Sequence, residues 1–291
     1  MTRRSVGCLA ILLAALLTTS MSAQRITRRI FVSARAAGAP VLDLTAADFQ
    51  IVENGTKREA ARAALGKAPM RIVLLVDSSS AMSPMLNHFR AGLNTFFDTL
   101  PPEHEVVFIT TGGQIRIRAQ PTTDRAALKT AVGRFSSDGG ANSFIATLLE
   151  ADRRMLRPVT QWPVFVLVTT DNGDARATAN INEYNAFMDS FLQRGGSAHG
   201  IVIKGANSAQ ISDVAENLIQ NTGGIHNVVN QSTAVEPGLK AIAERLAADH
   251  AKMANVYEID YPSDGKITKP AIEVGTSRGN VSLQLFPRRP I

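Results

Sequence analysis

One stretch, RIVLLVDSSSAM from Arg71 to Met82, constrains the fold of this chain more than any other. Its residues Ile72–Val76 are consecutive, apolar and mostly branched, which is typical of a strand buried on both faces of a parallel sheet. Asp77 follows directly, at the carboxyl end of the expected strand, where open α/β sheets place their ligand sites. The stretch therefore predicts a parallel sheet with a polar loop site at this end.

The chain from this strand to Asn255 alternates expected strands with expected helices. Apolar residues at helical spacing indicate the helices, and short apolar runs between them indicate the strands. Helices are expected over 84–100, 124–135, 143–157, 179–194, 208–220 and 232–253, and strands over 105–111, 114–119, 163–170, 198–204 and 225–229. The strand over 163–170 also ends on an aspartate, Asp171. This alternation predicts an α/β fold with a doubly wound, mostly parallel central sheet and helices on both faces.

Both flanks of this region have the two-residue period of β structure. Asn54-Gly55 follows an expected strand over 49–53, and both residues tolerate the positive φ of a tight hairpin turn. We expect the N-terminal β segment to pack with a C-terminal one as a small β subdomain. The predicted domains are a signal peptide over 1–23, an N-terminal β segment over 24–68, the α/β domain over 69–254 and a C-terminal β segment over 255–291.

The first 23 residues have the pattern of a signal peptide. Arg3 and Arg4 precede an apolar run over 6–17, and small residues lead to Ala23. The run is shorter than the roughly 20 residues that span a bilayer, so cleavage near Ala23 is preferred to an uncleaved anchor. We therefore expect a secreted or periplasmic protein with no membrane contact after cleavage. The single cysteine, Cys8, lies in this leader, so no disulfide is expected in the mature chain.

Composition excludes a nucleic-acid partner. The formal charge is +6, but the basic residues are spread along the chain and aromatic residues make up only 5%. A nucleic-acid surface needs a basic stripe with aromatic side chains among it. We interpret the charge as a solvated surface. The partner of the protein and its oligomeric state are not identified by the sequence.

Three blocks of sequence carry a family resemblance: LLVDSSSAM, SDGGAN before the expected helix over 143–157, and VLVTTDNGD after the strand over 163–170. In this order they resemble the von Willebrand factor type A domain. The flanking DLTAADFQIVENG and VYEIDYPSDGK resemble the β segments of bacterial secreted proteins that carry such a domain. The likeness covers nearly all of residues 26–286. It implies a Rossmann-like sheet and a protein-binding, adhesion-type role.

The same resemblance implies a metal-ion-dependent adhesion site that binds Mg²⁺, with Asp77, Ser79 and Asp171 as ligands. Mg²⁺ is a hard ion that prefers six oxygen ligands. Ala81 and Ala141 stand where the family has a serine and a threonine, so two expected ligands are methyl groups. Two interpretations stay open. The site is degenerate and binds Mg²⁺ weakly, or it is a relic in which these residues cap helices and hold loops.

No enzyme signature is present in the sequence. A phosphatase-like nucleophile at Asp77 would want a carboxylate two residues on, where the chain has Ser79, and the serines lack the turn of an α/β-hydrolase. No pair of histidines has metal-ligand spacing, and the five are scattered as His88, His104, His199, His226 and His250. No catalytic residue and no cofactor other than Mg²⁺ is therefore expected.

The leading hypothesis is a secreted, non-enzymatic binding module that presents the loops at the carboxyl edge of its sheet to a protein partner. It rests on the fold resemblance and is an argument by analogy. The alternative is a scaffold protein whose loop site is inert and whose partners contact the β subdomain. A hydrolase is the third and least favoured hypothesis.

Overall fold

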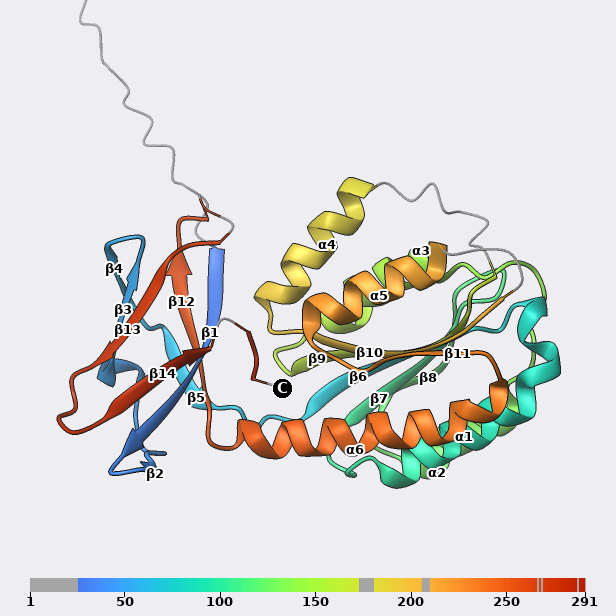
Figure 1. Ribbon diagram of the computed structural model, residues 1–291, viewed down its shortest axis with the longest axis horizontal. Helices are drawn as coiled ribbons and strands as arrows, with labels where there is room; N and C mark the ends of the chain where they lie inside the picture. Colours follow the sequence, from blue (N-terminus) through green and yellow to red (C-terminus); the bar gives the residue numbers. More distant parts are fainter. Residues whose placement is uncertain are drawn as a thin grey trace, which may run out of the picture.

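The computed structural model describes residues 26–172, 181–205, 210–265, 267, 269–286 and 288–290. It consists of an α/β domain and a smaller β subdomain that lie side by side along the long axis of the molecule (Figure 1). The predicted signal peptide over 1–23 lies outside the described residues. No helix within the described ranges is long and apolar enough to cross a membrane.

A six-stranded sheet forms the centre of the α/β domain, in the order β11-β10-β9-β6-β7-β8. Its strands are β6 (Met70–Val76), β7 (Glu105–Thr110), β8 (Arg116–Thr122), β9 (Trp162–Thr170), β10 (Ser197–Ile203) and β11 (His226–Val229). All neighbouring pairs are parallel except β7 and β8, which form the expected hairpin at Gly112-Gly113. In register, Leu74 of β6 lies between Phe108 of β7 and Val166 of β9. The strand predicted from RIVLLV is therefore at the centre of the sheet.

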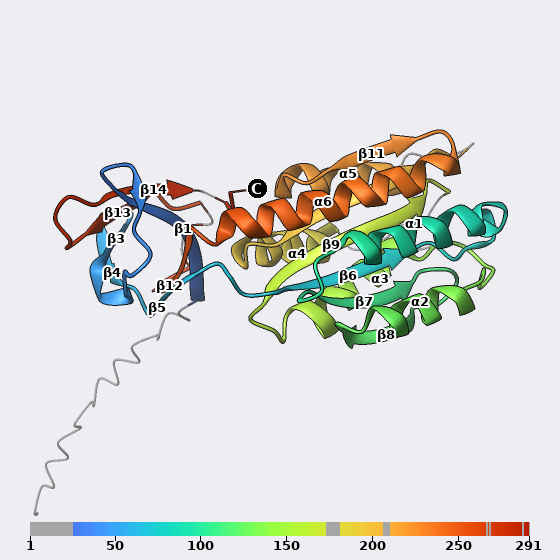
Figure 2. The same ribbon diagram turned by 90° about the horizontal axis from the view of Figure 1, so that it is seen from below.

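Helices cover both faces of this sheet (Figures 1 and 2). One layer holds α1 (Leu86–Thr99), α2 (Arg125–Arg134) and α6 (Val235–Met253), and the other holds α3 (Phe144–Ala151), α4 (Ile181–Gln193) and α5 (Gln210–Thr222). Successive side chains of a strand point to opposite faces. Accordingly, Leu74 belongs to the core cluster with α1 and α6, while Leu75 belongs to the cluster with α3, α4 and α5. This two-sided burial explains why β6 has no polar residue after Arg71.

Two predicted helices differ in detail from the observed ones. The helix expected over 84–100 begins as a 3₁₀ segment, Ser80–Met85, before α1. The helix expected over 143–157 is observed as α3 followed directly by a π-helical segment, Asp152–Leu156. The Asp152 side chain is buried there and accepts hydrogen bonds from Arg157 at 2.7 Å and from Arg194 at 2.5 Å. These pairs with residues outside α3 are not visible in a helical hydropathy pattern.

The β subdomain joins the two ends of the chain. Strand β1 (Ile26–Ala36) pairs with β2 (Ala39–Pro40), β12 (Tyr257–Ser263) and β14 (Ser282–Phe286), β12 pairs with β5 (Arg62–Leu65), and β3 (Phe49–Glu53) pairs with β4 (Thr56–Glu59) and β13 (Ile272–Thr276). The turn between β3 and β4 is Asn54-Gly55, with φ of 49° and 77°. The predicted fold class, an α/β sheet plus a β subdomain built from both terminal segments, is confirmed. The predicted domain boundaries stay predictions.

Arg289 fastens the β subdomain to the α/β domain. Its side chain is 2% exposed and forms an ion pair with Glu258 of β12. The guanidinium lies 4.1 Å from the ring centroid of Trp162 in β9 and 4.9 Å from that of Phe31 in β1. Its Nε donates to the Gly195 carbonyl at 3.0 Å. Burial lowers the pKa of Arg289 to about 10, so it is charged at neutral pH and acts as a cation between two aromatic faces.

We expect Arg289→Ala to destabilise the protein by about 3 kcal/mol, because it leaves the Glu258 carboxylate buried without its main partner. Urea unfolding measures this change. Arg35→Ala is the matched control, since the Arg35 side chain is exposed and donates to the Gly38 carbonyl at 2.9 Å; it should change the free energy of unfolding by less than about 0.5 kcal/mol. Equal effects of the two substitutions would contradict the role given to Arg289.

Candidate functional site at the carboxyl edge of the sheet

Asp77 bridges the ends of β6 and β9. It is fully buried, and its backbone N–H donates to the Val168 carbonyl at 2.8 Å, which continues the ladder between the two strands. One carboxylate oxygen accepts the Ser79 N–H at 2.7 Å. The other accepts the Thr170 N–H at 3.2 Å and the Thr170 hydroxyl. The carboxylate therefore has three neutral donors, which satisfy most of its hydrogen-bonding capacity.

Ser79 lies beside Asp77 but has an unused hydroxyl. Its backbone N–H holds the Asp77 carboxylate, whereas its Oγ is buried and has no hydrogen-bond partner within the described residues. A buried hydroxyl without a partner is unfavourable by about 1–3 kcal/mol. The structure thus brings Asp77 and Ser79 together and leaves one oxygen available between the loops.

Asp171 takes part in a different contact. It follows Thr170 directly, and its Oδ1 accepts the Ser212 N–H at 3.2 Å in the first turn of α5. Burial raises the pKa of Asp171 above its ordinary value, the nearby Asp213 adds to this effect, and the bond from Ser212 opposes it. The Asp171 carboxylate therefore holds the N-terminus of α5. Asp171 is also the chain neighbour of Thr170, which binds Asp77.

The positions of the two missing ligands are taken over by other groups. Ala81 lies in the 3₁₀ segment and Ala141 is exposed. Next to Ala141, the buried Asn142 accepts the Thr111 hydroxyl at 2.5 Å and donates to the Thr169 hydroxyl at 2.8 Å. This amide bridges the ends of β7 and β9, so the loop is held without a hydroxyl at position 141.

Asp138 is a central residue of the edge that the sequence analysis did not single out. It accepts the Ser78 hydroxyl at 2.7 Å and a hydrogen bond from Arg118 of β8, and Arg116 lies 3.3 Å from its other oxygen. Burial alone would raise the pKa of Asp138, but Arg118, Ser78 and Arg116 together hold it below its ordinary value. The only signal for it in the sequence was its place in SDGGAN, before two turn glycines.

Gly112 lets the β7–β8 turn approach the first loop closely. Its N–H donates to the Ser78 hydroxyl at 2.9 Å. A Cβ at this position would lie 2.4 Å from the Ser78 carbonyl carbon, closer than such atoms come in proteins. Glycine is therefore required here by the contact between two backbones.

These residues fit a hard divalent cation in part. Asp77, Ser79 and Asp171 supply oxygen donors, and the partnerless Ser79 hydroxyl is the clearest opening for an ion. Both carboxylates already accept backbone N–H groups, and positions 81 and 141 have only methyl groups. A six-coordinate ion would therefore need water for most of its ligands.

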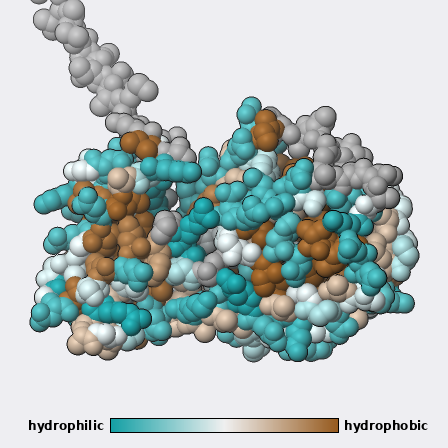
Figure 3. Space-filling view, viewed as in Figure 1, coloured by the Kyte–Doolittle hydropathy of each residue, from teal (hydrophilic) through white to brown (hydrophobic). Residues whose placement is uncertain are grey.

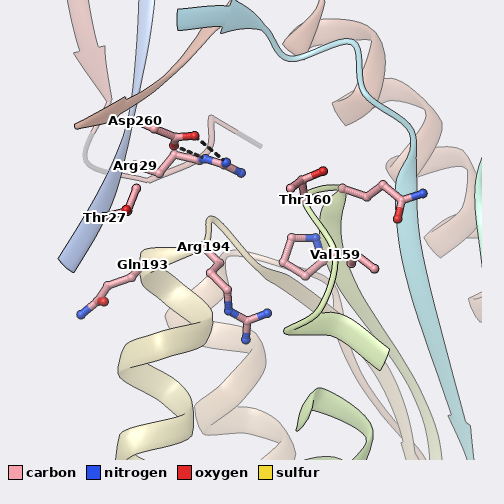
Figure 4. A pocket seen from close by; sticks show the side chains of 9 residues that line it. Thr27, Arg29, Val159, Thr160, Gln193, Arg194 and Asp260 are labelled. Atoms are coloured by element: carbon pink, nitrogen blue, oxygen red, sulfur yellow. Dashed lines mark hydrogen bonds and ion pairs between the residues drawn. The ribbon is translucent and has the colours of Figure 1, made fainter. Parts of the chain in front are cut away.

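A crevice with a volume of about 160 Å³ lies between the α/β domain and the β subdomain. Its lining includes Arg29, Arg194 and Asp260 (Figure 4). Arg29 donates two hydrogen bonds to Asp260, at 2.7 and 3.0 Å, and Arg194 pairs with Asp152. Both cations are neutralised by partners within the protein. The crevice is therefore a contact region between the two domains and not an anion-binding site.

Comparison with known proteins identifies the domain that carries the loop edge. Residues 72–174 match the family model of the von Willebrand factor type A domain. Among solved structures, a von Willebrand factor type A protein from Catenulispora acidiphila is 13% identical, with a TM-score of 0.50. That alignment covers 76% of this chain and 50% of the other, so the chain spans half the length of that structure.

The von Willebrand factor domain of a type V pili tip protein from Porphyromonas gingivalis is 10% identical, with a TM-score of 0.51. It covers 62% of this chain and 96% of its own. At such low identity these two structures show the fold alone. A comparison with curated proteins gives no match. The matched segment contains Asp77, Ser79, Asp138 and Asp171. Residues 72–174 therefore match a von Willebrand factor type A domain in sequence, and the α/β part of this chain has the fold of these domains.

Proposed function

We propose that this chain is a non-enzymatic, adhesion-type binding module that presents the carboxyl-edge loops of its sheet to a protein partner. The observation that carries the proposal is the edge itself. Asp77, Asn142 and Asp138 fix its three loops by side-chain hydrogen bonds, while Ser80 and Ala141 are exposed on those loops. Loops held by a rigid scaffold are where binding residues concentrate.

The polar groups at the edge support binding rather than catalysis. A nucleophilic serine needs a base within hydrogen-bond reach. Among the described residues of the edge, the hydroxyl of Ser78 donates to Asp138, that of Ser80 lies 3.4 Å from the Gly140 carbonyl and that of Ser143 lies 3.3 Å from the Gly113 carbonyl. Asp138 is tied to Arg118, which lowers its basicity. The hydroxyls of these three serines therefore hold the loops together.

Mg²⁺ at this edge would be held by Asp77, Ser79 and Asp171, and it would present a hard, positively charged site to a partner carboxylate. We propose that its binding is weak, with a dissociation constant on the order of 1 mM, because water must supply the remaining ligands. The loops keep their geometry without the ion, since neutral donors already satisfy Asp77.

Ser79→Ala tests this assignment without disturbing the Asp77 contacts, which involve only the backbone of Ser79. We expect the variant to lose the heat of Mg²⁺ binding in calorimetry. In EDTA its free energy of unfolding should rise by about 1 kcal/mol, because a buried hydroxyl without a partner is removed.

Ser83→Ala is the matched control, since Ser83 is exposed in the same segment. It should leave both the Mg²⁺ heat and the stability as in the natural chain. Identical Mg²⁺ heats for Ser79→Ala and the natural chain would remove Ser79 from the ion site.

A second candidate function places the partner on the β subdomain. Figure 3 shows an apolar area over this subdomain and another over the α/β domain, with hydrophilic residues around both. Leu42, in the connection after β2, is 44% exposed. Exposed apolar area of this kind is found at protein interfaces. This function would leave the loop edge inert.

Paired substitutions separate the two binding surfaces. Four tagged proteins are each incubated with an envelope extract of the source organism. They are the natural chain, Ala141→Arg at the loop edge, Leu42→Asp on the β subdomain and Ala126→Arg on α2 as the control. We expect a protein to be retained by the natural chain, Leu42→Asp and Ala126→Arg and to be lost with Ala141→Arg, because a long charged side chain blocks the edge. Loss with Leu42→Asp alone would instead support the β-subdomain function.

We further propose that the protein is exported, on the strength of the leader over 1–23. Intact mass of the protein expressed in a bacterium with its leader should correspond to a chain that begins near Gln24. A mass that includes residues 1–23, recovered with the membrane fraction, would show the uncleaved anchor instead.

A further inference from the structure

We propose that Glu103, His104 and His250 form a second metal site, for Zn²⁺ or a similar late transition-metal ion, at the end of the sheet opposite the loop edge. Each of the three residues offers a ligand atom, and these atoms lie within 4.8 Å of one another. Two ligands of a tetrahedral Zn²⁺ at about 2.1 Å from the ion are about 3.4 Å apart. The donor atoms would therefore have to approach one another by up to about 1.4 Å, and the exposed Glu103 side chain is the freest of the three to move.

The cluster joins two segments that are distant in the sequence. Glu103 and His104 come immediately before β7, and His250 lies in the last turn of α6. The rings of His104 and His250 meet edge to face, with centroids 4.6 Å apart. His250 also contacts Ala68 in the connection between β5 and β6, and His104 contacts Met70 at the start of β6, where the chain passes from the β subdomain into the α/β domain. An ion here would tie α6 and β7 at that passage.

His250 presents a lone pair to the cluster. Its Nε2 lies 3.0 Å from the Ala68 carbonyl oxygen, which can only accept, so this nitrogen carries the hydrogen. In the neutral ring the other nitrogen, Nδ1, is the acceptor, and it lies 4.0 Å from a carboxylate oxygen of Glu103. A ring N–H fixed by a backbone carbonyl is the usual support of a metal-bound histidine.

His104 supplies the buried nitrogen of the cluster. The side chain is fully buried, and its Nε2 has no hydrogen-bond partner among the described residues. A buried imidazole with a partnerless nitrogen is suited to an ion that prefers nitrogen ligands.

Two contacts oppose the ion and limit its affinity. The Met70 N–H donates to His104 Nδ1 at 3.3 Å, and ligation through Nε2 places the ring hydrogen on Nδ1, so this long bond is given up. Arg125 is a neighbouring cation, although its Nη2 is directed to the carbonyls of Pro101 and His104 at 2.8 and 3.0 Å. Loss of one long hydrogen bond is small beside the free energy of zinc binding to histidine sites. The net expectation is affinity in the micromolar range.

Zn²⁺ titration of the untagged mature protein by calorimetry tests the site. We expect one ion per chain for the natural protein and for His88→Ala, which removes an exposed histidine of α1. Affinity should fall about tenfold or more in Glu103→Gln and in His250→Gln, because each removes one ligand. His250→Gln retains an N–H for the Ala68 carbonyl, so loss of affinity is not a consequence of losing that bond.

Two further readouts distinguish this site from the loop edge. Saturating Zn²⁺ should raise the midpoint of thermal unfolding of the natural chain and not that of His250→Gln. Co²⁺ in place of Zn²⁺ should give the visible absorption of a four-coordinate site in the natural chain only. Ser79→Ala should leave all three measurements unchanged, so the outcome does not depend on the proposed function. Equal Zn²⁺ affinity in the natural chain, Glu103→Gln and His250→Gln, or no heat with the natural chain, would overturn the proposal.

Discussion

The buried carboxylate of Asp77 is the interaction on which the loop edge depends. An anion inside the protein must be neutralised or fully hydrogen-bonded, because water is not available to solvate it. Here the donors come from the Ser79 backbone and from Thr170, and each bond fixes a different element. The first sets the turn after β6, and the second joins that turn to the end of β9. The two central strands of the sheet are thus closed at their carboxyl ends by one side chain.

The remaining loops are arranged around this closure by the same kind of contact. Asn142 links the ends of β7 and β9, and Asp138 links the loop before Asn142 to Ser78 and to Arg118 of β8. Charge is distributed accordingly, with Asp138 held by arginines and Asp77 by neutral groups. The opposite end of the sheet is built differently. There Arg289 and the histidine cluster lie close to the β subdomain, with aromatic faces and ring nitrogens in place of hydroxyls.

Local patterns in the sequence predicted the elements, and long-range contacts decided the sites. The strand Ile72–Val76 and the Asn54-Gly55 turn follow from hydropathy and from the φ that each residue tolerates. The bond between Asp77 and Thr170 spans 93 positions, and the two histidines of the proposed metal site come from the segment before β7 and from α6. Such pairs are too far apart in the sequence to be recognised from residue spacing. The five histidines are therefore scattered when only the sequence is considered. Arg289 likewise contacts residues on four separate segments.

The two alanines at the loop edge affect the ligands of the proposed Mg²⁺ site but not the contacts that hold its loops. A methyl group at position 81 or 141 removes a ligand, but it removes no contact that holds the loops, because Asn142 and the Thr170 hydroxyl hold them instead. The exposed side chains at the edge therefore keep their arrangement whether or not an ion is present. Under the proposed function, partner binding at this surface depends on its shape and on the exposed groups around Ala141, and Mg²⁺ adds only the weak attraction of a partly hydrated ion.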